Sequence, residues 1–340
     1  MLTSTIAARR DQRSAETSTA PAAAAEQQPR PSFRPYDVSV AAIERLSDSF
    51  TRVTFTGPEL HEFGTAGLDQ RIKLVLPLPE VGVAHFPRGT AWYECWRNLP
   101  DGQRNPIRTY TVRAARPGRR EIDIDFVMHG DGGPAACWVA TASVGDQLTI
   151  VGPDERGENP RIGIEWRPGT ARTLLIAGDE TAAPAICSIL ASLPRDAIGS
   201  AFIEVPHASD AQPTDAPAGV RVTWLARSTA GHGAALDTAV RAWTDCFLAD
   251  HHATLRALRA HRAQRAELAD LDLDREILWD IPTEPVAVDA AGLSGHLYAW
   301  LAGEASVIKG LRRFLVTETG VDRRQVAFMG YWRDGRAEHA

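Results

Sequence analysis

The first residues whose types and spacing could do chemistry are Arg108, Thr109, Tyr110 and Thr111, at the start of an expected strand. Because side chains alternate along a strand, Arg108 and Tyr110 share one face and the two threonines share the other. A guanidinium matches a pair of phosphate oxygens, a tyrosine ring offers a stacking surface, and a hydroxyl can hydrogen-bond a ring nitrogen. This set could hold a phosphorylated flat heterocycle, although such residues are also common on an ordinary strand surface.

A second group lies where the expected strand 121–126 leads through His129 and Gly133 to Ala135 and Ala136. Small residues at such a junction let the backbone approach a ligand, and the free N–H groups of a first helical turn attract a diphosphate. A plain strand–turn–helix connection explains the same residues equally well. His129 by itself is more typical of a hydrogen-bonded structural histidine than of a catalyst.

A third group, Gly178, Asp179, Glu180 and Thr181, ends an apolar strand. Ligands of open parallel sheets bind at the carboxyl ends of the strands. The two acids suit a helix start but would repel a phosphate, so the nicotinamide end of a dinucleotide fits this loop better than its diphosphate. Helix capping is the alternative role. The opposite wall of the same cleft is expected from the residues that end a later strand, Ala302, Gly303 and Glu304.

The elements that must position these groups fall into two parts. In the first part, alternating apolar residues and turns predict a six-stranded antiparallel β-barrel, with a short helix from Pro134. Its expected strands are 37–46, 50–56, 70–76, 108–115, 121–126 and 147–152.

From Arg172 onward, strands and helices alternate, which predicts a parallel sheet wound on both faces. Helices are expected near Pro184 and over 305–319, where Gly320 ends the second one. The expected strands are 173–178, 201–205, 220–226, 297–302 and 325–329. The predicted fold class is therefore β followed by α/β.

Composition excludes several classes of protein. The chain has 340 residues, 44% hydrophobic and 24% charged, which is typical of a globular protein of about two domains. No apolar run is long enough to cross a bilayer, and a net charge of −6 argues against a nucleic-acid binder with a wholly cationic surface. The four cysteines form no C-x-x-C pair, which favours free thiols in the cytoplasm. Residues 1–32 have the composition of a disordered tail without a signal sequence.

Five motifs in order resemble those of the siderophore-interacting proteins, a family of flavin-dependent ferric-siderophore reductases related to ferredoxin–NADP reductases. The motifs are R-x-Y-T, DFVMHGDGGPAACW, LLIAGDETAAPAI, AWLAGE and GYWRDGRAEH. The resemblance implies an FAD-binding barrel at 33–160 and an NAD(P)H-binding α/β domain at 170–340. A charged, leucine-poor helical insertion at about 242–290 lies outside the resemblance, and no chemistry is assigned to it.

The resemblance also implies roles for individual residues. Arg108 would bind the FAD phosphate, Tyr110 would pack on the isoalloxazine, and Thr111, beside Thr109, would approach the flavin N5. The ribityl and diphosphate path would be lined by Val127, His129, Gly133, Ala135 and Ala136. The nicotinamide and flavin would face Gly178, Asp179, Glu180, Thr181, Ala302, Gly303 and Glu304. The anionic ferric chelate would be bound by Lys73, Arg333 and Arg336.

One departure from the family concerns the segment after the last barrel strand. The family often has G-P-R-G-S there, whereas this chain has Asp154 and Glu155 after Gly152-Pro153. Two acids in place of a cation weaken any anion site at this point. The electron donor also stays open. Glu204 or Asp210 could bind a ribose hydroxyl of NADH, Arg227 could accept the 2′-phosphate of NADPH, and reduced ferredoxin is a third donor.

The predicted function is the transfer of electrons from NAD(P)H through FAD to a ferric siderophore, which releases Fe(II) in the cytoplasm. One alternative is a flavin reductase that supplies an oxygenase or ferredoxin, although the chain has no cysteine cluster for an iron–sulfur centre. The other is a siderophore-binding flavoprotein without catalysis. A monomer or weak dimer is expected, with no nucleic-acid partner.

Overall fold

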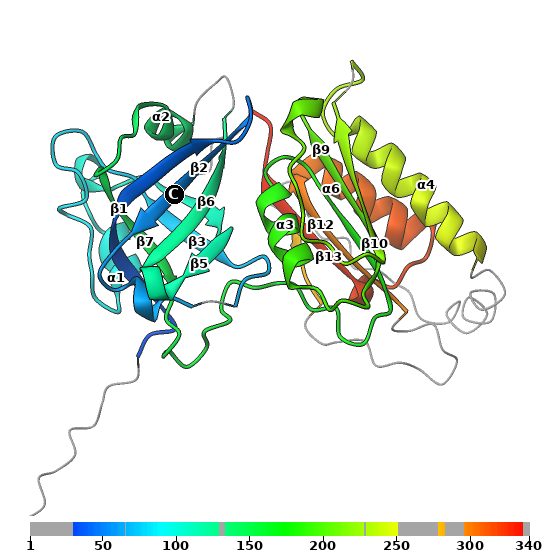
Figure 1. The fold of residues 1–340 in the computed structure, drawn as a ribbon, viewed down its shortest axis with the longest axis horizontal. Coiled ribbons are helices and arrows are strands. Elements are labelled where there is room, and N and C mark those ends of the chain that lie inside the picture. Colours follow the sequence, from blue (N-terminus) through cyan, green and yellow to red (C-terminus); the bar gives the residue numbers. More distant parts are fainter. Residues whose placement is uncertain are drawn as a thin grey trace, which may run out of the picture.

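The computed structural model describes residues 30–64, 66–128, 133–227, 229–250, 278–282 and 296–335. Most of the predicted N-terminal tail and most of the predicted insertion lie outside these residues, as do His129 and Arg336. The described chain forms two sheets that lie side by side, each built from one half of the sequence (Figure 1). None of the helices in the described ranges is long and apolar enough to cross a membrane.

The first sheet is antiparallel and curled, with strand order β4-β3-β7-β1-β2-β6-β5. Its strands are β1 (Phe33–Arg45), β2 (Phe50–Thr56), β3 (Arg71–Val75), β4 (Ile107–Thr111), β5 (Ala114–Arg116), β6 (Glu121–Val127) and β7 (Gln147–Pro153). Side chains that alternate along these strands, such as Ile122, Ile124 and Phe126, point into one buried core.

The strand predicted at 108–115 is wrong as a single element, because the chain changes partners inside it. β4 pairs with β3, whereas β5 pairs with β6 at the other end of the sheet. Between them, the Val112 N–H donates to the Gln70 carbonyl and the Arg113 N–H donates to the Asp123 carbonyl. One continuous stretch of chain therefore joins the two ends of the sheet and curls it, as the predicted barrel requires, with seven strands rather than six.

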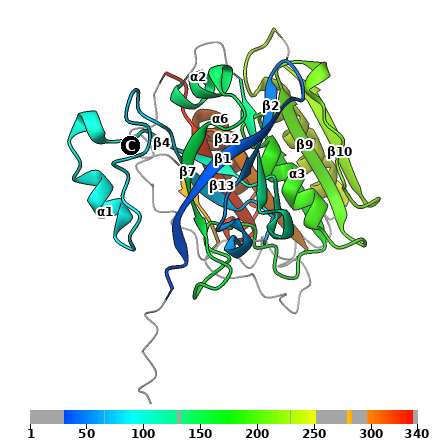
Figure 2. The ribbon, with the colours of Figure 1, turned by 60° about the vertical axis from the view of Figure 1, so that its left-hand side comes forward.

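Two helices belong to this half. The predicted one is α2 (Pro134–Thr141), which follows β6. The other, α1 (Trp92–Arg97), was not predicted; it lies between β3 and β4, on the side of this half away from the second sheet (Figures 1 and 2). Trp96 anchors α1, since its buried indole N–H donates to the Asn105 carbonyl at 3.0 Å.

The second sheet has the order β10-β9-β8-β12-β13-β11 and is parallel except for the edge strand β11. Its strands are β8 (Thr173–Gly178), β9 (Ile198–Val205), β10 (Val220–Ala226), β11 (Trp279–Asp280), β12 (Leu297–Glu304) and β13 (Val326–Trp332). This sheet confirms the predicted α/β class. The short edge strand β11 lies within the range expected to be a helical insertion.

Helices cover both faces of this sheet. On the face toward the first sheet, α3 (Ala183–Ser192) packs in a core that also contains Phe50. On the other face lie α4 (Ala234–Asp250) and α6 (Ala305–Arg312), which share a second core (Figure 1). The predicted helix 305–319 continues past α6 as a wider π-helical turn at Arg313–Glu318, and Gly320 follows at φ +76°.

A buried carboxylate joins the two halves. Asp69 lies just before β3, and it accepts hydrogen bonds from the Trp300 indole N–H at 2.9 Å and from the Glu165 and Trp166 backbone N–H groups. Trp300 lies on β12. Because a buried carboxylate is stable only when its oxygens are satisfied, these bonds fix one half against the other.

Candidate functional site

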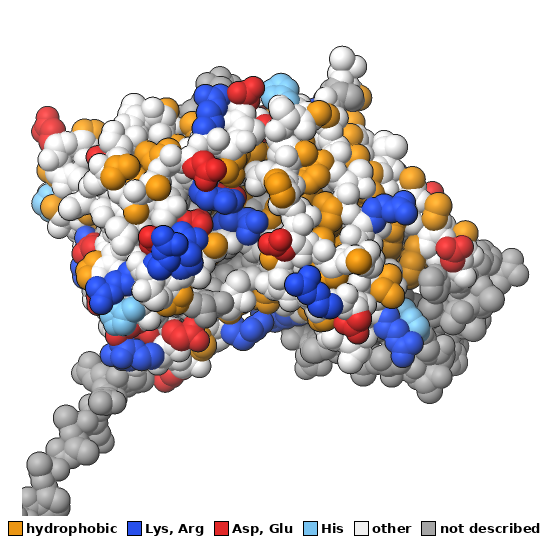
Figure 3. Space-filling model, viewed as in Figure 1, with side chains coloured by type: hydrophobic (Ala, Val, Ile, Leu, Met, Phe, Trp, Pro, Cys, Tyr) orange, Lys and Arg blue, Asp and Glu red, His pale blue; other side chains and the backbone are white. Residues whose placement is uncertain are grey.

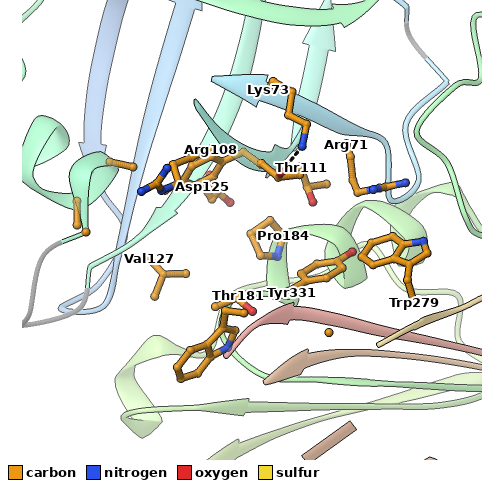
Figure 4. Close-up of a pocket in the computed structure, with 17 residues that line it drawn as sticks. Arg71, Lys73, Arg108, Thr111, Asp125, Val127, Thr181, Pro184, Trp279 and Tyr331 are labelled. Atoms are coloured by element: carbon orange, nitrogen blue, oxygen red, sulfur yellow. Dashed lines mark hydrogen bonds between the residues drawn. The ribbon is translucent and has the colours of Figure 1, made fainter. Parts of the chain in front are cut away.

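A cavity of about 570 Å³ lies between the two halves, and residues from both line it (Figure 4). The first half contributes residues of β3, β4 and β6 and the start of α2. The second contributes the start of α3, the edge strand β11 and the end of β13. The lining residues are Arg71, Lys73, Arg108, Thr109, Tyr110, Thr111, Asp125, Val127, Gly133, Ala135, Ala136, Thr181, Pro184, Trp279, Gly330, Tyr331 and Trp332.

The predicted Arg-Thr-Tyr-Thr edge is part of this wall, on β4. The Tyr110 ring packs on Phe126 of β6, with ring centroids 4.6 Å apart, so the core of the first sheet holds it in place. The Arg108 guanidinium donates to its neighbour's carbonyl, that of Ile107, at 2.7 Å. Thr109 and Thr111 also line the cavity, and Thr111 is largely buried. An aromatic face and an arginine fork therefore meet on one strand.

Cations outnumber unpaired acids around this wall. Lys73 lies next to Thr109 in the β3–β4 ladder, and its Nζ donates to the Thr109 Oγ1 at 2.7 Å. Asp125 is an acid on the same wall, but its carboxylate accepts two bonds, of 2.7 and 2.9 Å, from the Arg52 guanidinium. Because Arg52 neutralises Asp125, the field of Lys73 and Arg108 favours an anionic ligand.

The start of α2 supplies small residues and backbone N–H groups. Gly133 is the N-cap, and among the described residues no side chain caps this helix end by a hydrogen bond. Pro134 occupies the first turn, where its missing N–H costs nothing. Gly133, Ala135 and Ala136 line the cavity, as does Val127 at the end of β6. The first turn of α2 therefore presents small residues to the cavity, which suits an anion site.

At the carboxyl end of β8, only Thr181 of the predicted loop lines the cavity. Asp179 and Glu180 are almost fully buried, and Asp179 accepts bonds from the Thr181 N–H and Oγ1, the Glu304 N–H and the Trp332 indole. Glu304 accepts bonds from the first turn of α6 and acts as its cap. These carboxylates therefore hold the loop and the neighbouring strand ends in place.

Gly178, Ala302 and Gly303 pack beneath the cavity and do not line it. A Cβ at Gly178 would meet the Ala302 carbonyl oxygen at 2.6 Å, and one at Gly303 would meet the Asp179 carboxylate at 2.6 Å. Gly303 also has a φ of +150°, which side chains rarely adopt. The two glycines are thus needed for close packing of β8 against β12 and of β12 against Asp179.

A half-buried histidine completes this cluster. The His232 Nε2 lies 3.4 Å from the Asp179 Oδ2 and 3.7 Å from the Glu180 Oε2. Burial alone would lower the pKa of His232, but the two carboxylates close to its ring raise it to about 9. Burial alone would raise the pKa of Asp179, whereas the nearby His232 ring and the bonds from Thr181 and Trp332 lower it below its ordinary value. The pair is therefore charged at neutral pH.

The residues considered for the nucleotide ribose are already engaged. Glu204 is fully buried and accepts bonds from Arg227 and from the Gly233 and Leu236 backbone N–H groups. Asp210 is also buried and accepts bonds from the hydroxyls of two serines of the first half, Ser47 and Ser49. Both carboxylates therefore point into the protein, and neither residue lines the cavity.

Sequence reasoning missed seven residues of the wall, Arg71, Asp125, Pro184, Trp279, Gly330, Tyr331 and Trp332. In the motif GYWRDGR, the sequence predicts a role for the arginines. The structure places Tyr331 and Trp332 of this motif in the cavity wall, whereas Arg333 does not line it. A signal for Tyr331 and Trp332 was present, since they follow the predicted strand 325–329 on the side where ligands bind. Trp279 gave no comparable signal, because it lies in the range predicted as an insertion.

Comparisons with known proteins agree with this geometry. Residues 39–157 match the model of the siderophore-interacting FAD-binding domain, and residues 171–335 match that of the siderophore-interacting protein family. Protein Rv2895c of Mycobacterium tuberculosis, which is uncharacterized, is 32% identical over 88% of this chain and 90% of its own. The ferric vibriobactin reductase ViuB of Vibrio cholerae is 28% identical over 87% and 88%.

Among solved structures, the siderophore-interacting protein SipS of Aeromonas hydrophila superposes with a TM-score of 0.61 at 28% identity, over 91% of this chain and 95% of that one. The two family models together cover nearly all of both sheets and every lining residue of the cavity. The order of the motifs, the fold and the cavity thus lead to one assignment. The chain belongs to the siderophore-interacting protein family.

Proposed function

We propose that this protein is an FAD-dependent ferric-siderophore reductase with NAD(P)H as its electron donor. One observation carries the proposal: a single cavity joins the Arg108–Tyr110–Thr111 edge, the start of α2 and Thr181 at the end of β8. A flavin held by the first half can therefore be reached from the second half, where donors bind in open parallel sheets.

The residues present fit FAD. The cavity volume of about 570 Å³ lies in the range of ligand pockets, and the first turn of α2 offers backbone N–H groups to a diphosphate. We assign the FAD phosphates to Arg108 and to this helix start, with Gly133, Ala135 and Ala136. Tyr110 and Thr111 would contact the isoalloxazine, as the family resemblance implies. When bound, FAD takes a hydride from NAD(P)H and delivers single electrons to ferric iron.

The donor side is assigned to the second half. Thr181 would contact the nicotinamide directly. Asp179, Glu180 and Glu304 would act as positioning residues, because their oxygens already bind Thr181, Arg227 and the start of α6. This assignment differs from the expectation that the three acids themselves face the nicotinamide.

The substrate is assigned to the cationic part of the cavity. Lys73 and Arg71 line it, and both would attract an anionic ferric chelate. Arg333 lies outside the wall, so its contribution would be at longer range. One hydride carries two electrons and reduces two ferric ions in turn, with one proton released. Because Fe(II) binds hard oxygen donors less tightly than Fe(III), the reduced metal leaves the chelate.

An anaerobic turnover assay tests the proposal. The purified holoprotein is given NADH or NADPH with a ferric chelate, and Fe(II) is trapped with a ferrous chelator. We expect a flavin spectrum that NAD(P)H bleaches. We also expect trapped Fe(II) to accumulate only when the protein is present. Tight chelate binding without trapped Fe(II) would indicate a binding protein, and faster reduction of a quinone or ferredoxin than of every chelate would indicate a different reductase.

A further inference from the structure

We infer that the Trp279 end of the cavity binds an aromatic ring of the ferric chelate, so that this reductase prefers siderophores whose iron-binding groups carry aryl rings. The inference rests on the proposed function and specifies its substrate class. Trp279 is an aromatic side chain that lines the cavity and is 39% exposed. Most large aromatic side chains of the second half are more deeply buried.

Trp279 packs beside a second aromatic ring of the cavity wall. Its ring and that of Tyr331 are nearly parallel, with an angle of 13° between their planes and 6.1 Å between their centroids. Tyr331 meets Trp300 of the buried core edge-on, at 88° and 6.3 Å. The core therefore fixes the orientation of Tyr331, and Tyr331 in turn supports Trp279. Aromatic rings in such offset arrangements attract a further ring placed against them.

A cation covers one face of the Trp279 ring. The Arg71 guanidinium carbon is 4.3 Å from the centroid of the Trp279 ring, and the Arg71 Nη2 pairs with Glu165 at 2.5 Å. Glu165 thereby holds the guanidinium in place. Within the described residues, the Arg71 Nε and the Tyr331 hydroxyl are buried without a hydrogen-bond partner. Burial raises the pKa of Tyr331 well above its ordinary value, so this hydroxyl stays a donor at neutral pH.

These features suit one kind of ligand group. An aliphatic chelate gains little from an aromatic wall, whereas an aryl ring can pack against the exposed part of Trp279 that Arg71 does not cover. If the iron-binding oxygen of that ring carries negative charge, it also meets the field of Arg71 and of Lys73 nearby. A stacked anionic ring thus uses the aromatic surface and the cation together.

The place of Trp279 separates it from the residues assigned to FAD. Figure 4 shows Trp279 and Arg71 at one end of the cavity, whereas Arg108 and Val127 lie toward the other end. A flavin that follows Arg108 and the start of α2 therefore leaves the Trp279 end for the substrate. A change at Trp279 should accordingly affect chelate recognition and leave FAD binding unchanged.

The test compares two uncharged chelates whose hydroxamate groups carry either phenyl or methyl, ferric tris(benzohydroxamate) and ferric tris(acetohydroxamate). For the wild-type holoprotein, we expect kcat/KM to favour the benzohydroxamate by about three- to tenfold, the range given by one ring–ring contact. Trp279→Leu should bring this ratio close to one, and Trp279→Phe should retain most of it. Tyr93→Leu is the matched control, because Tyr93 is an exposed aromatic residue of α1 that does not line the cavity.

Two further measurements separate chelate recognition from turnover and from cofactor binding. The gallium complexes of both hydroxamates cannot be reduced, so their affinity for the holoprotein reports recognition without turnover, and it should show the same preference. FAD affinity and the KM for NAD(P)H should be unchanged in Trp279→Leu.

A wild-type ratio near one, or a Trp279→Leu variant that keeps the wild-type ratio, overturns the inference while the reductase function stands. Weakened FAD or NAD(P)H binding in that variant also overturns it, since Trp279 would then belong to the cofactor site. If the wild type reduces neither chelate nor any other ferric siderophore, the proposed function itself fails.

Discussion

The Trp332 indole N–H donates to the Asp179 carboxylate at 2.9 Å, which joins the cavity wall to the buried charges beneath it. The His232 ring approaches the same carboxylate oxygen and meets the Trp332 ring edge-on at 5.2 Å. Asp179 is therefore shared by a cavity-lining aromatic residue, a histidine and the Thr181 loop. Through Asp179, the end of β13 and the end of β8 keep a fixed relation to each other.

Replacing this carboxylate should destabilise the protein. Asp179→Asn keeps the size of the side chain but removes its charge, which leaves His232 without its nearest acid. We expect the free energy of unfolding to fall by about 3 kcal/mol, as when one partner of a buried ion pair is removed. Urea unfolding at pH 7, followed by circular dichroism, measures the change.

The control for this variant is Asp48→Asn, at an exposed ion pair with Arg45. Exposed pairs of this kind contribute little, so its unfolding midpoint should stay close to that of the wild type. Equal midpoints for Asp179→Asn and Asp48→Asn would show that Asp179 does not hold the site together.

The second prediction concerns pH. The pKa of His232 is raised from 6.5 in the unfolded chain to about 9 in the fold, so the imidazolium stabilises the folded state. This contribution is complete below about pH 6.5 and is lost as the pH rises through about 9. His232→Gln should therefore be less stable than the wild type at pH 6, by about 1–2 kcal/mol after allowance for solvent screening. Unfolding curves measured from pH 6 to 9.5 test this.

The difference between His232→Gln and the wild type should shrink toward pH 9.5. His61→Gln serves as the control, because His61 is exposed and far from the Asp179 cluster. A stability difference for His232→Gln that does not change across this range would mean that packing, rather than charge, explains the role of the ring.

Much of the fold could be predicted because the signal is local. The strands Thr173–Gly178 and Val220–Ala226 have the bounds expected from their apolar runs. The division of 108–115 into β4 and β5 could not be predicted in this way. It depends on which carbonyls accept from Val112 and Arg113, and those carbonyls belong to residues far away in the sequence.

The site was predictable to a similar degree. Arg108, Tyr110 and Thr181 line one cavity, as their positions at strand ends and edges suggested. The sequence pattern could not tell whether Asp179 points toward a ligand or into the protein, because a carboxylate near a helix start suits both. In the structure, Asp179 points into the protein, because its hydrogen-bond partners lie there. One of them, Trp332, comes from the far end of the chain.

The third prediction tests the flavin site. Arg108→Ala removes a guanidinium from the cavity wall and should weaken FAD binding about ten- to hundredfold, as expected for the loss of a charge-assisted hydrogen bond. Titration of the apoprotein into FAD, followed by quenching of flavin fluorescence, measures the Kd. Arg119→Ala is the control, since Arg119 is exposed on the first half and does not line the cavity. If both variants bind FAD like the wild type, the flavin does not use Arg108.

The last prediction uses the only two lysines of the chain, Lys73 and Lys309. Lys73 lines the cavity, whereas Lys309 lies on the exposed side of α6 and does not. Lys73→Met should raise the KM for an anionic chelate, ferric tris(catecholate), about tenfold, because it removes a cation that a charged ligand can reach. The KM for the uncharged ferric tris(acetohydroxamate) should change much less.

Lys309→Met loses the same charge from the whole molecule, so it separates a local effect from a general one. It should leave both KM values unchanged. Added salt screens charges in open sites, so at 0.5 M NaCl the difference between Lys73→Met and the wild type should become smaller. Equal effects of the two substitutions would mean that net charge, and not a cation placed in the cavity, attracts the chelate. A Lys73→Met effect of the same size on both chelates would instead mean that Lys73 shapes the wall through its bond to Thr109.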